Sequence, residues 1–335
     1  MSALRKTPPP SVDQDQPGIV RSYAFMEGDG QFRHEVLAGL AASRKSLPFH
    51  WRHDHEGLLA AEAWAGAPEN HLLAGEAALL QAHLPEAAVI MGAGLELIEM
   101  GPGCGLQTPL VLEHLDAPLY LPLGRDPAGL AAAIGRVAER RPGQHIAALY
   151  ADPLQPLILP RFAGVALRKR ALFLSALALA TWTVDDLALL LRQARRLLGS
   201  GGAVLATLDL KKNRKWLDGA VNDAQGLAAR WNASLLGRIN RELEGDFQAE
   251  RFRHVGMHNE KLGCTGLYLE SAYAQFVHVA GQRIDFAEGE VMLTGLLTQH
   301  SEQDFTVMAA EAGFKLQKFW SDEQRRVGLA LLMAV

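Results

Sequence analysis

The sequence predicts an α/β protein in which a Rossmann-like parallel sheet is joined by an inserted second α+β domain. Three observations favour this fold class. Segments of strand length alternate with helical segments between residues 72 and 208, as they do in a doubly wound sheet. A glycine-rich turn connects the first of these strands to a helix. After Asp209 the pattern changes to a long helix and to segments typical of antiparallel strands.

The length and composition are those of an ordinary globular protein. The chain has 335 residues, more than one domain usually holds, with 49% hydrophobic residues, 21% charged residues and a net charge of −4. Because there is no basic excess, we expect neither nucleic acid nor an anionic membrane as a partner. The sequence has no signal-peptide pattern and no apolar run of membrane-spanning length, so we expect a cytoplasmic protein.

The N-terminal part of the chain predicts a tail followed by a helix. Residues 1–18 contain four prolines and no periodicity, so we expect a disordered tail, with order beginning near Ile19 to Arg21. Gln31 to Ala42 has apolar residues at helical spacing, which predicts a short amphipathic helix with one face formed by Phe32, Val36, Leu37 and Leu40.

A segment rich in histidine, His50 to Gly57, is expected to form a loop after Pro48. It holds residue types that bind metals, but no third, distant ligand is identified, so no metal site is predicted. His53, and His71 further along, are candidates for a catalytic base or a substrate contact, because an unperturbed imidazole titrates near ~6.5. The alternative for both is a hydrogen-bonded structural histidine.

The stretch around the first strand is the most informative. Leu72 to Leu84 predicts a helix and Ala88 to Ile98 predicts the strand. The strand continues into E-M-G-P-G-C-G, Glu99 to Gly105, where glycine would allow a ligand to approach the backbone closely. The third glycine comes one residue earlier than in the dinucleotide pattern G-x-G-x-x-G. A simple turn in another α/β protein is the alternative for this stretch alone.

The rest of the predicted sheet follows in regular order. The expected elements are a strand over Leu119 to Leu123, a helix over Pro127 to Arg141, strands over His145 to Leu149 and Arg170 to Leu179, a helix over Thr183 to Leu198 and a strand over Ala203 to Leu208. Two acids follow strands of this set. Asp126 would hydrogen-bond ribose hydroxyls or cap the next helix, and Asp152 would accept from an adenine amino group or stabilise a turn.

The last third of the chain predicts an insertion and a return to the sheet. The expected elements are a helix over Trp216 to Leu243, strands over Gly266 to Ala272, Ala274 to Val279 and Gln282 to Phe286, a helix over Gln299 to Ala312, and a hairpin of Phe314 to Phe319 with Gly328 to Met333. We therefore expect one domain from residues 60–210 and 299–335, and a second, substrate-binding domain from residues 19–59 and 211–298.

Several motifs together resemble the histidine-specific S-adenosylmethionine (SAM)-dependent methyltransferase family, known for histidine N-alpha-methylation in the ergothioneine pathway. They are K-S-L-P-x-x-W at Lys45 to Trp51, E-M-G-P-G-C-G at Glu99 to Gly105, L-D-L-K-K at Leu208 to Lys212, INRELEGDF at Ile239 to Phe247, F-x-H-V at Phe252 to Val255, F-A-E-G-E-V-M-L-T at Phe286 to Thr294 and F-W-S-D-E at Phe319 to Glu323. The resemblance implies a class I methyltransferase sheet that binds SAM through Glu99, Gly101, Gly103, Gly105, Thr108, Asp126 and Asp152.

The positions that the resemblance assigns to the substrate depart from the family pattern. The expected tyrosines fall at His53, at Asn70 or His71, and at Val221, and the expected asparagine falls at Ala180. The glutamate that would face the imidazole falls at Gly295, and the serine two residues later becomes Leu297. In the cofactor site, the first acid after the second strand falls at Gly124, which leaves Asp126 nearby.

These departures indicate that histidine is no longer the acceptor. A pocket made to hydrogen-bond one ligand discriminates because its polar groups stay unpaired with another, and most of those groups are replaced here. We therefore expect a SAM-dependent N-methyltransferase that acts on another small amine or amino acid. The alternative is a catalytically inactive relative that serves as a binding or partner subunit.

Overall fold

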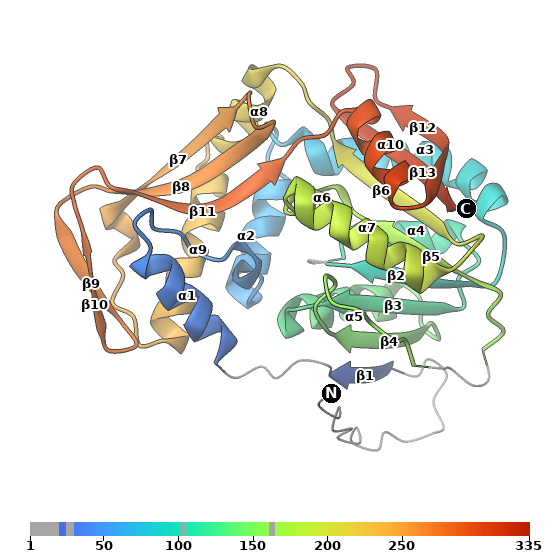
Figure 1. Ribbon diagram of the computed structural model, residues 1–335, viewed down its shortest axis with the longest axis horizontal. Coiled ribbons are helices and arrows are strands. Elements are labelled where there is room, and N and C mark those ends of the chain that lie inside the picture. Colours follow the sequence, from blue (N-terminus) through green and yellow to red (C-terminus); the bar gives the residue numbers. More distant parts are fainter. Residues whose placement is uncertain (1–19, 25–29, 102–104, 161–164) are drawn as a thin grey trace.

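The computed structural model describes residues 20–24, 30–101, 105–160 and 165–335. The predicted tail, residues 1–18, and the predicted cofactor residue Gly103 lie outside these described residues. The described chain forms a large mixed sheet and, beside it, a three-stranded antiparallel sheet and a two-stranded hairpin (Figure 1).

The large sheet has eight strands in the order β1-β4-β3-β2-β5-β6-β13-β12. Its strands are β1 (Val20–Ala24), β2 (Leu95–Met100), β3 (Leu119–Gly124), β4 (His145–Tyr150), β5 (Lys169–Leu174), β6 (Ala203–Asp209), β12 (Phe314–Ser321) and β13 (Val327–Ala334). The first six run parallel, while β13 is antiparallel to both β6 and β12. The predicted Rossmann-like sheet is therefore confirmed, and the carboxyl ends of its parallel strands meet at one edge.

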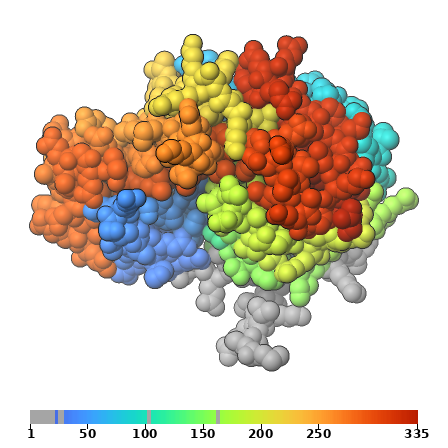
Figure 2. Space-filling model, turned by 45° about the horizontal axis from the view of Figure 1, so that its top comes forward, coloured from blue at the N-terminus to red at the C-terminus, as the bar shows by residue number. Residues whose placement is uncertain are grey.

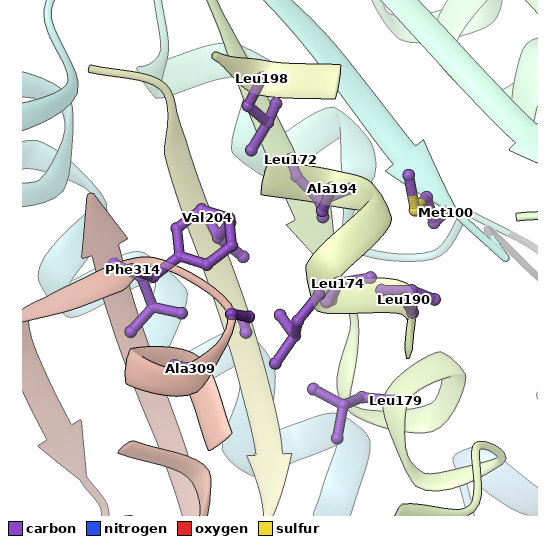
Figure 3. Packing of buried hydrophobic residues seen from close by; sticks show 14 of the residues in the cluster. Met100, Leu172, Leu174, Leu179, Leu190, Ala194, Leu198, Val204, Ala309 and Phe314 are labelled. Atoms are coloured by element: carbon purple, nitrogen blue, oxygen red, sulfur yellow. The ribbon is translucent and has the colours of Figure 1, made fainter. Parts of the chain in front are cut away.

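Helices pack on both faces of the large sheet. One face is covered by α3 (His71–Met91), α4 (Thr108–His114) and part of α5 (Pro127–Arg140), and the other by α7 (Val184–Leu198) and α10 (Glu302–Glu311). Figure 3 shows how Leu190, Ala194 and Leu198 of α7 lie over the buried strand residues Leu172 and Val204. The apolar sequence of the central strands is thus explained by burial on two faces.

The antiparallel part forms a second lobe, orange and dark blue in Figure 2. Its elements are α1 (Gln31–Ala41), η1 (Phe49–Arg52), α2 (His55–Ala65), α8 (Arg214–Val221), α9 (Leu227–Glu242), η2 (Ala249–Arg251), β7 (Phe252–Asn259), β8 (Cys264–Ser271), β9 (Gln275–Val279), β10 (Gln282–Phe286) and β11 (Val291–Thr298). Helices α1 and α9 share one hydrophobic core with all five of these strands. A short helix after β5, α6 (Ala176–Ala180), lies between the lobes and contacts β11.

Two predicted strands of the large sheet have different bounds. The strand predicted over Ala88 to Ile98 is wrong in its first half, because α3 continues through Pro85 to Met91. Its buried residues Leu80, Leu84, Ala87 and Met91 keep helical spacing, whereas Val89 is exposed. The strand predicted over Arg170 to Leu179 ends at Leu174, after which the chain turns into α6.

The second lobe also differs from the prediction in detail. The helix expected over Trp216 to Leu243 is two helices, α8 and α9, separated by a turn before Gly226, whose φ is 68°. The loop expected over His50 to Gly57 contains the end of η1 and the start of α2. Strands β7 and β11 were not predicted, and β1 pairs with β4 of the large sheet although its residues were expected in the substrate-binding domain. The domain boundaries themselves stay a prediction.

Candidate cofactor and acceptor site

A cavity of about 470 Å³ lies at the carboxyl edge of the large sheet. The sheet contributes residues that follow its strands, among them Gly101 after β2, Gly124 at the end of β3 and Ser175 after β5. The opposite wall is formed by the chain from η1 to α2, including Phe49, His53 and Trp64. The cavity therefore joins the edge where α/β sheets bind ligands to the second lobe of the molecule.

Two glycines of the predicted bend have different surroundings. Gly101 has a φ of 62° and lines the cavity, and a Cβ placed on it would meet only the Ala178 side chain, at 3.8 Å. Gly105 also has a φ of 62°, but a Cβ there would lie 2.9 Å from both Cα and Cβ of Ala133. Glycine at position 101 thus opens the cavity, whereas glycine at position 105 allows α5 to pack closely.

Glu99, the acid before the bend, is bonded inside the protein. Its Oε2 accepts hydrogen bonds from the Thr108 hydroxyl at 2.7 Å and from the Tyr120 hydroxyl at 2.5 Å. Burial raises the pKa of this carboxyl to about 7, although the two hydroxyls act in the opposite direction. Neither Glu99 nor Thr108 lines the described cavity. These hydrogen bonds connect strand β2 to the start of α4 and to β3, and the contact of Glu99 with a ligand stays a prediction.

Glu76 on α3 does line the cavity, and no prediction included it. Its side chain is buried, and Oε1 accepts a hydrogen bond of 2.8 Å from the backbone N–H of Ala176. Burial raises its pKa to about 7, against the effects of that N–H group and of the Thr207 hydroxyl. One signal was present in the sequence, because Glu76 follows Leu72 by four residues and precedes Leu80 by four, which places an acid on the apolar face of the helix.

The two acids that follow strands β3 and β4 differ in their access to the cavity. Asp126 lines it and caps α5 by accepting from the N–H groups of Ala128 and Gly129, with Arg238 at 3.4 Å. Burial raises the pKa of Asp126, while Arg238 lowers it. Both predicted roles of Asp126, ligand contact and helix cap, are compatible with this position.

Asp152 stabilises a turn. One of its oxygens accepts from the N–H of Leu154 at 2.9 Å, and the other lies 2.6 Å from the guanidinium of Arg125. Asp152 does not line the described cavity, whereas Leu154 and Arg125 do. These contacts agree with the turn alternative for Asp152, and its contact with adenine stays a prediction.

The two candidate histidines are not brought together. His53 lines the cavity with its ring edge-on to Phe49, at 6.2 Å between centroids. Burial first, and the nearby Arg52 second, lower the pKa of His53 to about 4, so it is neutral at pH 7. His71 lies outside this cavity, with Nε2 2.6 Å from Nζ of Lys212 and 3.9 Å from the buried Asp209 carboxylate.

The positions that the family resemblance assigns to the acceptor are mostly packed. Ala180, Val221 and Leu297 belong to one buried hydrophobic cluster with Trp64 and Trp231, whose rings stack at 4.5 Å. The space left beside them is only about 20 Å³, enough for roughly one water molecule. Asn70 borders both this space and the main cavity, and its side chain caps α3 at Leu72 and donates to the Trp64 carbonyl. The replaced positions Ala180, Val221 and Leu297 thus form part of a packed core.

Gly295, where the resemblance expects a glutamate, is covered by an aromatic ring. A Cβ at this position would overlap Phe49 and would lie 3.4 Å from Nη1 of Arg52. Arg52 is fully buried between Phe49 and Trp231, at 4.5 and 4.9 Å from the two rings. Its Nη2 donates to Asn232 and to the Thr294 carbonyl, while Nε and Nη1 have no partner among the described residues. Burial lowers its pKa to about 9.

The acids near His53 form internal contacts as well. Asp54 caps α2 by accepting from Gly57, and both Asp54 and Glu56 pair with Arg241. Within the described ranges, no group of three or more histidine, cysteine, aspartate or glutamate side chains is placed to hold a metal ion. In the same ranges, no helix combines the length and the apolar character needed to span a membrane.

A family comparison and the similar curated proteins both identify histidine methyltransferases. A family described as "Histidine-specific methyltransferase, SAM-dependent" matches residues 32–334. Histidine N-alpha-methyltransferase of Mycolicibacterium smegmatis (strain ATCC 700084 / mc(2)155) is 31% identical over 306 residues, which cover 89% of this chain and 94% of that protein. The protein of the same name from Mycobacterium tuberculosis (strain CDC 1551 / Oshkosh) is 29% identical over the same shares.

Solved structures resemble the chain less closely. Magnesium protoporphyrin IX methyltransferase from Synechocystis PCC 6803, with bound S-adenosylhomocysteine (SAH), has a TM-score of 0.47 and 10% identity over 85% of this chain and 98% of its own. A similarity at this level gives no information about the substrate.

Proposed function

The chain belongs to the histidine-specific, SAM-dependent methyltransferase family, and we propose that it methylates a small amine or amino acid other than histidine. It has the α/β class I methyltransferase fold of that family, and its cofactor is S-adenosylmethionine. The cofactor supplies a methyl group on a sulfonium, which an amine lone pair attacks in line. The protein's own part is to bind, orient and enclose the reactants.

The observation that supports this proposal most is the cavity between the sheet edge and the second lobe. Gly101 and Gly124 leave space beside the backbone at the ends of β2 and β3, and Asp126 presents a carboxylate next to them. A volume of about 470 Å³ falls in the usual range of roughly 300–1,000 Å³ for small-molecule sites. These residues fit a nucleoside cofactor at the sheet edge.

On the acceptor side, we propose that His53 orients the amine. A neutral imidazole accepts a hydrogen bond from an amine N–H, which would fix the direction of the lone pair. Because its pKa is about 4, His53 is a weak base at neutral pH and does not store the proton that the amine loses. Phe49 and Trp64 enclose the same region and keep water out.

Two features favour an acceptor other than histidine. The carboxylate that would face an imidazole is absent at Gly295, and the nearest charged group there is the Arg52 guanidinium. A cation at that place disfavours an imidazolium and favours a neutral or anionic group. In addition, Ala180, Val221 and Leu297 offer no hydrogen-bonding side chain and are buried in one cluster.

The same cluster supports the alternative function, an inactive relative that acts as a binding or partner subunit. Packing of the acceptor positions to a residual space of about 20 Å³ is what loss of a substrate chamber would produce. The two functions differ in the ligands that the protein must bind and in whether it turns them over.

Calorimetric titration with SAM and with SAH is the first test. We expect saturable binding of both ligands, and absence of heat at protein concentrations well above the micromolar range would reject the enzyme proposal. The second test measures SAH release from SAM with a panel of aliphatic, aromatic, acidic and basic amino acids, histidine included. Turnover with another amine supports the proposal, turnover that is best with histidine rejects the changed acceptor, and binding without any turnover supports the inactive alternative.

A further inference from the structure

We infer that Glu76 of α3 is the carboxylate that binds the ammonium group of the cofactor's amino-acid end. The inference rests on the proposed binding of SAM in the main cavity, and it gives that role to a residue outside the glycine bend. No pattern at the bend indicated it, because Glu76 precedes Glu99 by 23 residues and comes from the helix before the first sheet-edge strand.

A comparison of the acids that line the cavity supports this choice. Three acids do so, namely Glu76, Asp126 and Asp186. Asp126 is already held by two backbone N–H groups and faces Arg238. Asp186 accepts from the Thr183 hydroxyl at an exposed place. Glu76 is only 2% exposed, and none of the described ion pairs contains it, so its charge is free to pair with a ligand cation.

The position of Glu76 joins it to the glycine bend. Its Oε1 accepts from the N–H of Ala176 at the start of α6, and Ala178 of the same helix lies against Gly101. Gly101 and Glu76 also line the same cavity, so one ligand in it can contact both. The acid of the bend itself, Glu99, is a weaker candidate for this part, because its Oε2 accepts from two hydroxyls and it does not line the described cavity.

The electrostatic setting agrees with a ligand cation. Glu76 faces the Ala176 N–H, the Thr207 hydroxyl and Glu99, which is an acid, and burial raises its pKa to about 7. A bound ammonium would favour the ionised carboxylate and lower that pKa. At pH 6 this carboxyl is therefore mostly protonated in the free protein, so binding of an ammonium would release protons.

The first test compares two ligands by calorimetry, without an acceptor. SAH carries the amino-acid end, and 5′-methylthioadenosine lacks it. Glu76→Gln should weaken SAH about 10- to 100-fold, as expected for loss of a hydrogen bond to a charged group, and should change the affinity for methylthioadenosine less than 3-fold. Glu86→Gln is the matched control, since Glu86 lies on the same helix, half exposed, and pairs with Lys318. It should change neither affinity.

The second test measures protons directly. SAH binding at pH 6, in two buffers of different ionisation enthalpy, should release protons from the unaltered protein and nearly none from Glu76→Gln. Equal weakening of both ligands by Glu76→Gln, or unchanged proton release in that variant, would overturn the inference. If Glu76→Gln does not fold, the unaltered protein still tests the inference. Proton release with SAH but not with methylthioadenosine would support it, and equal proton release with both ligands would overturn it. Failure of both ligands to bind the unaltered protein would instead reject the proposed function.

Discussion

The Tyr120 hydroxyl donates a hydrogen bond of 2.5 Å to Oε2 of Glu99, across the neighbouring strands β3 and β2. Tyr120→Phe removes one of the two hydroxyl donors to a buried carboxyl, so we expect the free energy of unfolding to fall by about 1–3 kcal/mol. SAH affinity should stay within 3-fold, because Glu99 does not line the cavity. Urea unfolding and calorimetry measure the two quantities. Tyr273→Phe is the control, since Tyr273 is exposed. A loss of affinity without a loss of stability would place Glu99 in contact with the ligand.

The two described glycines of the bend should respond differently to alanine. Gly105→Ala should lower the free energy of unfolding by at least about 2 kcal/mol for two reasons. Alanine is strained in the left-handed backbone conformation at this position, and its Cβ would lie too close to Ala133. Gly101→Ala should cost about 1–2 kcal/mol for the backbone alone and should weaken SAH strongly, since its Cβ would enter the cavity. If both variants lost SAH binding equally and were equally stable, the assignment of a packing role to Gly105 and a ligand-space role to Gly101 would be contradicted.

Gly295→Ala should destabilise the protein by about 1–3 kcal/mol, because its Cβ would displace the Phe49 ring from its place against Trp231 and Arg52. Gly219→Ala is the matched control, because nothing lies within 4 Å of its added Cβ and it sits inside α8. This second change should be neutral or stabilising. Thermal and urea unfolding of the two variants provide the measurement, and equal stability of both would show that Phe49 is free to move.

The stability of the protein should depend on the protonation of Glu76. Its pKa rises from 4.5 to about 7 on folding, so the stability that it contributes is fully present below pH 4.5 and is lost as the pH rises through 7. His53 and His300 act in the opposite direction, since burial lowers both pKa values to about 4 and stability is lost as the pH falls from 6.5. Between pH 5 and pH 8, Glu76→Gln should therefore gain stability relative to the unaltered protein, by at most about 3 kcal/mol. Urea unfolding at both pH values tests this, and a constant difference would contradict it.

His53→Phe should lower kcat for an amine that the panel identifies by about 10- to 100-fold, while SAH affinity changes little. In the unaltered protein, the rate between pH 6 and 8 should show no inflection from His53, because its pKa is about 4. His55→Gln serves as control, since His55 is exposed at the start of α2. An inflection near pH 6.5 that disappears in His53→Phe would mean that this imidazole does act as a base.

The sequence predicted the sheet well because the sheet is governed by local signals. Buried strands such as β3 and β6 read as continuous apolar runs, and Gly199 marks the end of α7. The wrong element bounds lie in segments whose apolar residues fit both a strand and a helix. Ala88 to Met91 is apolar enough for a strand, yet it forms the last turn of α3, with Met91 buried and Val89 exposed. Strand β7 alternates weakly, since four of its eight residues are half-buried, and no clear period is visible.

The site could be located from the sequence but not resolved. The bend at Gly101, Asp126 and His53 were all placed at one cavity, since each follows a recognisable signal along the chain. Two hydrogen bonds of the site could not be predicted, because they join residues far apart in the sequence. Tyr120 donates to Glu99 over a separation of 21 residues, and the N–H of Ala176 donates to Glu76 over a separation of 100 residues. The periodicity of a single segment does not predict hydrogen bonds to residues in other segments.

The buried packing of Ala180, Val221 and Leu297 in one cluster with Trp64 and Trp231 has a consequence for substitutions at these positions. A tyrosine, asparagine or serine introduced singly among these residues would be enclosed without a bonding partner and would cost roughly 1–3 kcal/mol. Each such single substitution would therefore lower the stability of the protein. A redesign that places polar groups in this cluster would require several substitutions made together, so that the new groups can bond to one another.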